Sequence, residues 1–185
     1  DIEGEQPFTV EQAKLRRVID RVAFAMAQQD VRYYLNGMLL EVNASSLRSV
    51  ATDGHRLATC IVEASGPETQ LQLIVPRKGI LELSKLLTEP EDSVTLFLSP
   101  NHIRAETGDF VFTSKLVDGK FPDYGRVIPK NGNKVILADR QELRQVFQRT
   151  AILSNEKYRG VRVILNSGSL QVFANNPEQE EAEES

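Results

Sequence analysis

Hydrophobic residues recur along the chain at two spacings, one typical of helices and one typical of strands. Four apolar residues fall on one helical face: Leu15, Val18, Ile19 and Val22. Thr9 followed by Gln12 has the pattern of a capping box, which predicts that this helix begins near Thr9. A second helix is expected after Pro76, with five apolar residues on its buried side: Ile80, Leu81, Leu83, Leu86 and Leu87. Apolar runs predict strands near residues 35–42, 46–52, 57–64, 70–75, 93–98, 101–106 and 109–117.

A tight turn is predicted between two of these strands. Asp53-Gly54 is a typical hairpin dipeptide, in which the glycine supplies a positive φ. The turn would expose His55 and Arg56 at the edge of a sheet, with Leu57 beside them. Such a turn is consistent with a solvated hairpin as well as with a functional site.

The segment after the first helix, from Val31 to Tyr34, is expected to be extended. Two adjacent tyrosines, Tyr33 and Tyr34, would then point to opposite faces of a strand. An exposed tyrosine beside Arg32 would be a stacking platform for an unpaired base. A buried tyrosine with a satisfied hydroxyl group is an equally good interpretation.

The pattern of the first domain begins again after residue 132. Leu143, Val146, Phe147 and Thr150 repeat the first helical face at an offset of 128, and Asp139 with Glu142 forms a capping box. Lys134-Val135-Ile136-Leu137 is predicted to be a strand before this helix. Five residues further on match five residues of the first copy at an offset of 123: Gly160, Asn166, Ser169, Leu170 and Ala174 match Gly37, Asn43, Ser46, Leu47 and Ala51. We therefore predict an internal repeat, complete in its first copy and incomplete in its second.

Composition and charge limit the classes of function. The net charge is -4, but five glutamates lie in the last eight residues: Glu178, Glu180, Glu181, Glu183 and Glu184. Without them, 21 acidic residues remain against 22 basic ones, so the body of the chain can carry a basic surface. Lys14, Arg17 and Arg21 form such a stripe on the first helix, away from its apolar face.

No chemistry of metals or disulfides is indicated. The chain has one cysteine, Cys60, and two histidines, which excludes an internal disulfide and makes a structural zinc site improbable. No apolar run approaches the length of a membrane span, and no signal-peptide pattern is present. We expect a cytoplasmic protein without a membrane partner.

Six stretches taken together resemble the bacterial β sliding clamp family, the processivity subunits of replicative DNA polymerases. They are VRYYLNGM, VATDGHRLA, IVPRKG, FTSKLVDGKFPDY, AILSNEKYRGVR and ANNPEQEEAEE, and the resemblance runs from about Phe8 to Glu184. It implies an α+β fold in which a clamp domain with two helices packed on antiparallel sheets is followed by an incomplete second copy. The expected divisions are a linker at 1–7, the middle domain at 8–118, a connector at 119–132 and half of the last domain at 133–185.

The resemblance also implies partners and site residues. Clamps of this family close head to tail as homodimers around duplex DNA, need no cofactor, and dock polymerase, clamp-loader and repair proteins in a hydrophobic peptide pocket. The implied pocket residues are Leu35, Thr52, Gly54, His55, Arg56, Leu57, Pro122, Arg126 and Val127. The implied DNA contacts are Gln28, Gln29, Arg32, Tyr33, Tyr34, Arg77 and Lys78. The implied dimer interface comprises Ile152, Leu153 and the five C-terminal glutamates.

The sequence leaves three alternatives open. An exposed Phe24 would pack at a junction with the family's first domain, or else cap the core of its own domain. Asp53 and His55 could form the acid/base pair of an enzyme, but no nucleophile motif, metal set or phosphate-binding loop accompanies them. A peptide-binding module without a role on DNA is the remaining alternative.

Overall fold

A computed structural model of the protein describes residues 6–175 and 181–184. The chain divides into two compact units, Asp1–Gly125 and Arg126–Ser185.

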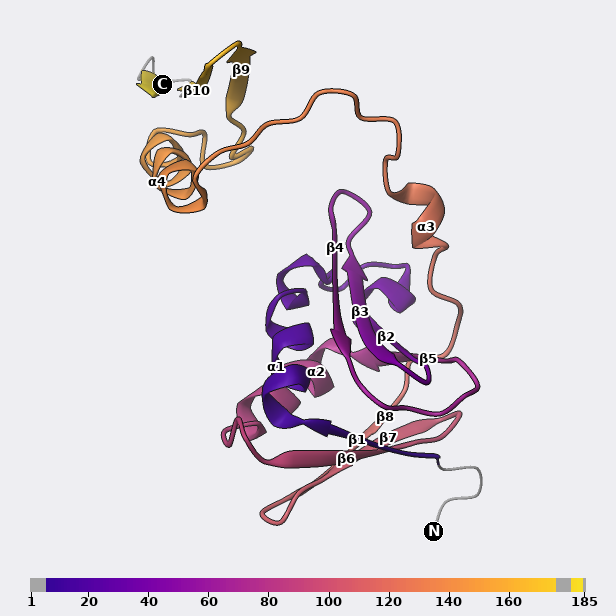
Figure 1. The fold of residues 1–185 in the computed structure, drawn as a ribbon. Helices are drawn as coiled ribbons and strands as arrows, with labels where there is room; N and C mark the ends of the chain where they lie inside the picture. Colours follow the sequence, from indigo (N-terminus) through magenta and orange to yellow (C-terminus); the bar gives the residue numbers. More distant parts are fainter. Residues whose placement is uncertain (1–5, 176–180, 185) are drawn as a thin grey trace. The chain divides into compact units, whose positions relative to one another are not determined.

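Two four-stranded antiparallel sheets and two helices build the first unit (Figure 1). One sheet has the order β1-β6-β7-β8, from strands Gln6–Glu11, Ser93–Leu98, His102–Glu106 and Val111–Lys115. The other has the order β4-β3-β2-β5, from strands Leu57–Glu63, Ser46–Thr52, Gly37–Val42 and Leu71–Pro76. Helix α1 (Gln12–Asp20) follows β1 directly, and helix α2 (Arg77–Leu86) follows β5 directly. Short 3-10 helices η1 (Ala23–Ala25) and η2 (Tyr33–Leu35) lie between α1 and β2.

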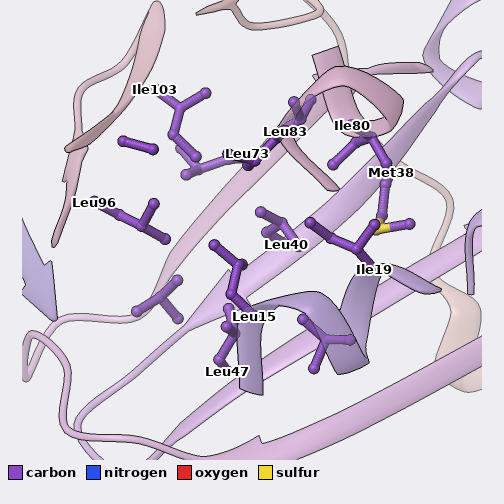
Figure 2. Packing of buried hydrophobic residues seen from close by; sticks show 14 of the residues in the cluster. Leu15, Ile19, Met38, Leu40, Leu47, Leu73, Ile80, Leu83, Leu96 and Ile103 are labelled. Atoms are coloured by element: carbon purple, nitrogen blue, oxygen red, sulfur yellow. The ribbon is translucent and has the colours of Figure 1, made fainter. Parts of the chain in front are cut away.

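The main core lies between the helices and the two sheets. Leu15 and Ile19 of α1, Leu40 of β2, Leu83 of α2 and Leu96 of β6 belong to one buried cluster, which Figure 2 shows from close by. The helical spacing of α1 and α2 and the alternation along β6 place these side chains on one side of their elements. This core confirms the predicted packing of two helices on antiparallel sheets.

A second, smaller cluster covers the opposite face of the β4-β3-β2-β5 sheet. Leu39 pairs with Val50 of β3 and with Ile74 of β5, and all three side chains belong to this cluster. Strand β2 is therefore buried at every position, because successive side chains enter different clusters. The cover comes from Phe121 of the connector, whose side chain is 7% exposed, together with Ala27 and Leu35.

The second unit repeats the beginning of the first. Helix α4 (Arg140–Ala151) begins 128 residues after α1, and Asp139 caps it by accepting a hydrogen bond of 2.8 Å from the Glu142 amide. Strands β9 (Arg162–Asn166), β10 (Ser169–Asn175) and β11 (Glu181–Glu184) form a sheet of order β11-β10-β9. Strand β10 occupies the residues expected from β3 at the offset of 123. A single-turn helix, α3 (Tyr124–Val127), crosses the division between the units.

The prediction that the first helix begins near Thr9 is wrong. Thr9 lies in β1 opposite Thr95 of β6, and its hydroxyl group lies 3.1 Å from that of Thr95. The helix begins at Gln12, whose buried side chain accepts a hydrogen bond of 3.1 Å from the Glu89 amide. Cross-strand pairing with a segment more than 80 residues away thus overrides the local capping pattern.

The predicted strand at 134–137 is also absent. Val135 and Leu137 are 92% and 99% exposed, and no strand pairs with this segment among the described residues of the second unit. Its counterpart in the first unit is β1, which is a strand because it pairs with β6. The described part of the second unit contains no counterpart of β6, so the backbone groups of 134–137 lack a partner strand.

The predicted strand at the two tyrosines and the predicted burial of two leucines of α2 are also wrong. Tyr33 and Tyr34 do not lie in a strand but in η2, where their rings meet edge to face with centroids 5.8 Å apart. Leu81 and Leu86 are exposed rather than buried, because the side of α2 that carries Ile80 and Leu83 faces the core, and Leu87 just after the helix continues that side.

Candidate functional site

The β3–β4 turn is organised by its own side chains. Thr52 Oγ1 donates a hydrogen bond of 2.7 Å to the Arg56 carbonyl and accepts one of 3.1 Å from the Gly54 amide. Asp53 Oδ1 accepts hydrogen bonds from the amides of His55 (2.9 Å) and Arg56 (3.1 Å). Gly54 has a φ of +92°, as the dipeptide predicted. The turn is therefore a defined surface and not a loose loop.

The electrostatics of the turn follow from these hydrogen bonds. The pKa of Asp53 lies below its usual range, chiefly because the His55 amide donates to the carboxylate, with the Arg56 amide and guanidinium adding to the effect. Arg56 Nε lies 3.3 Å from Asp53 Oδ2.

Arg56 also reaches back to η1. Its Nη2 atom donates a hydrogen bond of 2.8 Å to the Phe24 carbonyl, and its guanidinium carbon lies 5.3 Å from the centroid of the Phe24 ring. The Phe24 side chain is 60% exposed, so the interpretation in which it caps the core of its own domain is wrong. Arg56 forms a polar boundary between the turn and this exposed ring.

An apolar floor adjoins the turn in the first unit. Leu35 is buried in the second cluster, and half-buried Leu57 packs against the same cluster. Phe121 belongs to it as well, and half-buried Pro122 follows Phe121 directly. The first unit thus brings two predicted pocket residues, Leu35 of η2 and Leu57 of β4, to one cluster, together with Phe121 of the connector, which was not predicted. Arg126 and Val127 belong to α3 and have exposed side chains.

A second predicted surface, the segment from Gln28 to Tyr34, contains an ion pair that sequence reasoning missed. Arg32 donates to both carboxylate oxygens of Asp30, at 3.0 Å from Nε and 2.9 Å from Nη2. The side-chain hydrogen bonds, followed by one of 2.8 Å from the Arg32 backbone amide, lower the pKa of Asp30 from 3.8 to about 2. The side-chain hydrogen bonds to Asp30 also raise the pKa of Arg32. The sequence signal for this pair is the presence of opposite charges two residues apart, at Asp30 and Arg32. The charge of Arg32 is therefore partly neutralised.

The remaining predicted DNA contacts lie on exposed or half-exposed positions of the first unit. Gln28 and Gln29 are exposed, and Gln29 adopts a φ of 56°. Lys78 is exposed and Arg77 is half-buried in the first turn of α2. Tyr33 is exposed, whereas Tyr34 is half-buried against the second cluster.

The basic stripe of α1 is smaller than the sequence suggested. Arg17 and Arg21 are exposed. Lys14, however, donates a hydrogen bond of 3.0 Å to the Glu63 carbonyl at the end of β4. Its ammonium group thus already has a hydrogen-bond partner within the first unit.

The predicted interface residues of the second unit are placed in part. Ile152 is 77% exposed just after α4, and Leu153 is half-buried. Glu181, Glu183 and Glu184 lie in β11, whose backbone pairs with β10. Glu178 and Glu180 lie outside the described residues.

One polar contact within the first unit was not foreseen. The Tyr124 hydroxyl group donates a hydrogen bond to Oε1 of Glu41, a residue of β2 that is only 7% exposed. Gln70 Nε2 donates to the other carboxylate oxygen at 2.8 Å. A glutamate inside the apolar run GMLLEV is the sequence signal that could have indicated such a partner.

A polar hollow of the first unit lies apart from these residues. It has a volume of about 840 Å³ and is lined by residues of β1, α1 and the β3 and β4 ends, among them Lys14, Ser45, Glu63 and Ser65. None of the predicted pocket residues lines it.

Neither a metal centre nor a membrane span is found among the described residues. No group of three or more histidine, cysteine, aspartate or glutamate side chains there is placed to hold a metal ion. In the same part of the chain, no helix is both long and apolar enough to cross a membrane.

Comparison with known proteins links this geometry to a family. Residues 9–123 match the model of the DNA polymerase III beta subunit, central domain, and residues 125–185 match that of its C-terminal domain. The chain is 66% identical over 182 residues to the Beta sliding clamp of Pseudomonas aeruginosa, and 53% identical over 184 residues to that of Escherichia coli. These alignments cover 98% and 100% of the chain but 50% of each relative, so the chain spans about half of their length.

Solved structures agree. A crystal structure of the DNA polymerase sliding clamp from Pseudomonas aeruginosa matches with a TM-score of 0.95 and 65% identity, over 100% of this chain and 51% of that one. A sliding clamp from Bartonella birtlesii, described as bound to griselimycin, matches with a TM-score of 0.89 and 39% identity, over 100% of this chain and 51% of that one. The predicted sliding-clamp fold is thereby confirmed, and the chain belongs to the DNA polymerase III beta subunit family, the bacterial sliding clamps.

Proposed function

We propose that this chain is the central and part of the C-terminal domain of a DNA polymerase processivity factor, a non-enzymatic clamp acting in the bacterial cytoplasm. The domain divisions proposed for it are 8–118, 119–132 and 133–185, after a linker at 1–7. The observation that carries the proposal is the meeting of Leu35, Leu57 and Phe121 on one apolar cluster beside a polar turn.

The proposed peptide site uses that cluster as its floor. A half-buried leucine beside a buried one offers an apolar anchor point, and a rim of His55 and Arg56 offers polar contacts. Within the first unit the full proposed set is Leu35, Thr52, Gly54, His55, Arg56, Leu57 and Pro122. Arg126 and Val127, which the family resemblance also implies, belong to the second unit. A related clamp is described as bound to griselimycin, which makes griselimycin a second probe for this site.

Duplex DNA is the second proposed partner, held without sequence preference inside a ring. The contacts would be Gln28, Gln29, Arg32, Tyr33, Tyr34, Arg77 and Lys78, together with Arg17 and Arg21 of the predicted basic stripe. Such contacts meet phosphates, so binding should weaken steeply with salt. In the longer protein, Ile152, Leu153 and the C-terminal glutamates would contribute to a head-to-tail homodimer. Exposure of Ile152 supports that assignment.

A peptide titration tests the docking role. Fluorescence polarisation with a labelled peptide of the QL-x-LF type is measured on the parent chain, on Leu57→Ala and on Leu81→Ala. Leu81 is an exposed leucine of α2 outside the proposed site and provides the matched control. We expect saturable binding by the parent and the control, with a loss of about tenfold or more in Leu57→Ala. Equal affinities for all three proteins would refute the site.

A salt titration separates the clamp from a peptide-binding module with no role on DNA. The affinity of the chain for a short duplex is measured against salt concentration, with Arg17→Ala/Arg21→Ala and a control, Lys115→Ala, on exposed positions. We expect a steep salt dependence in the parent and the control. In the arginine variant the slope should fall by about 1 for each arginine that no longer meets a phosphate. Absence of binding at low salt would favour the module.

A further inference from the structure

We infer that Tyr124 is a positioning residue for the proposed peptide site, acting through a polar anchor formed by Glu41, Gln70 and Tyr124. This inference rests on the proposed function, because it concerns the wall of that same site. The anchor fixes residues 119–124 of the connector, all of them in the first unit, against the face of the β4-β3-β2-β5 sheet that carries the second cluster.

The hydrogen-bond acceptor of the anchor is a buried carboxylate in the middle of the sheet. Glu41 lies in β2, paired with Arg48 of β3 and Gln72 of β5. Each carboxylate oxygen has its own donor, the Tyr124 hydroxyl group on Oε1 and Gln70 Nε2 on Oε2. Its cross-strand neighbour Arg48 instead donates to Thr59 Oγ1 at 3.2 Å. Removing the tyrosine hydroxyl group therefore leaves one buried oxygen of Glu41 without its donor.

The connector segment that carries Tyr124 is also held by an apolar contact. Phe121 lies three residues before Tyr124 and is buried in the second cluster. Pro122 sits between these two attachments, so its position is determined from both sides. Burial, followed by the bond to Glu41, raises the pKa of Tyr124 to about 12, which agrees with a hydroxyl group held in its neutral, donating form.

The start of the connector passes close to η2. Gly119 has a φ of +120°, and a Cβ built on it would lie 3.4 Å from the Tyr33 ring. The connector therefore follows the sheet from Gly119 to Tyr124, past the cluster against which Leu35 and Leu57 pack. Because Leu35, Leu57 and Phe121 share this cluster, release of the connector would alter the floor of the proposed site.

This arrangement predicts a kinetic signature. If the anchor holds the connector in its binding-competent position, then weakening the anchor lowers the fraction of competent molecules. The observed association rate for a peptide should fall in proportion to that fraction. The dissociation rate should change little, because the bound state still holds the connector in place.

The test compares the parent chain with Tyr124→Phe and with Tyr158→Phe. The control also loses one tyrosine hydroxyl group, but from an exposed residue outside the proposed sites. Hydrogen exchange of the amides of residues 119–121, 123 and 124, and stopped-flow kinetics with a labelled QL-x-LF peptide, are measured on each. We expect exchange in Tyr124→Phe to be about tenfold faster and association about five- to twentyfold slower, with the melting transition of the first unit retained. Unchanged exchange, or a loss confined to the dissociation rate, would overturn the inference.

Two further measurements keep the inference separate from the proposed function. Leu57→Ala removes a side chain of the floor itself, so loss of binding there with normal binding in Tyr124→Phe would refute the anchor alone. If the parent chain bound no peptide, the proposed site would fail, and the exchange data would still decide whether the anchor exists.

In a Glu41→Gln background, Tyr124→Phe should have a smaller effect on exchange, because the two residues act through one hydrogen bond. Full additivity would contradict the inference.

Discussion

Arg32 lies directly against Gly54. A Cβ built on Gly54 would come within 3.0 Å of Arg32 Nη2, and the same atom donates a hydrogen bond of 3.4 Å to the Asp53 carbonyl. The segment proposed to meet DNA thus touches the turn proposed to bind peptides. Substitutions at this contact should therefore be measured against both partners.

Gly54→Ala is expected to destabilise the first unit. The substitution places a side chain at a φ of +92° and pushes it against the Arg32 guanidinium. A strained backbone of this kind costs about 1 to 3 kcal/mol in the free energy of unfolding. Thermal or urea denaturation measures this loss, and Gly108→Ala, a glycine with nothing within 4 Å of its built Cβ, is the control. Equal stability of the two variants would contradict the structure of the turn.

Asp30→Asn is expected to strengthen DNA binding. Asp30 holds Arg32 through two hydrogen bonds and offsets its charge. With that carboxylate neutralised, Arg32 becomes available to a phosphate, and affinity at low salt should rise roughly two- to tenfold with a steeper salt dependence. Asp109→Asn, at an exposed turn between β7 and β8, controls for the change of one charge. An equal effect of both substitutions would show that only net charge matters.

The Asp30–Arg32 pair should break only in strong acid. The pKa of Asp30 is lowered from 3.8 to about 2 by Arg32, so folding favours the charged carboxylate. Its contribution to stability is complete above the ordinary pKa and is lost as the pH falls through about 2. Titration of the Asp30 side-chain carbon by NMR measures this. A midpoint near 3.8 would show that the pair does not form in solution.

The connector should be released in strong alkali. The pKa of Tyr124 is raised from 10.0 to about 12, so folding favours the neutral hydroxyl group. The contribution of the anchor is therefore complete below pH 10.0 and is lost as the pH rises toward about 12. The difference between tyrosinate absorbance titrations of the parent and of Tyr124→Phe isolates this group. A difference curve centred on 10.0 would mean that Tyr124 is not bound to Glu41.

Periodicity predicted most of the elements, because their burial follows from local spacing. Helix α4 and its Asp139 cap, helix α2 and the β3–β4 turn lie close to their predicted positions, whereas α1 has the predicted buried face but begins at Gln12. The failures at Thr9 and at 134–137 share one cause. Whether such a segment is a strand depends on a partner such as β6, which its own sequence does not contain.

In the candidate site, too, the features set by local sequence were predicted and the contacts between side chains were not. The turn residues and Leu35 were recognisable by resemblance, and the structure brings Leu35 and Leu57 to one cluster. The partners Asp30 of Arg32 and Glu41 of Tyr124 were not predicted. Both depend on side-chain geometry, and the second joins residues 83 positions apart.

The most direct test of the central claim is to map where a peptide binds. A labelled chain is titrated with a QL-x-LF peptide, and the shifts of its backbone amide signals are followed by NMR. The largest shifts should lie at Leu35, Leu57 and Phe121 of the second cluster and at Gly54 of the adjoining turn. Shifts concentrated instead at Ser45 and Ser65, in the polar hollow on another part of the first unit, would contradict it.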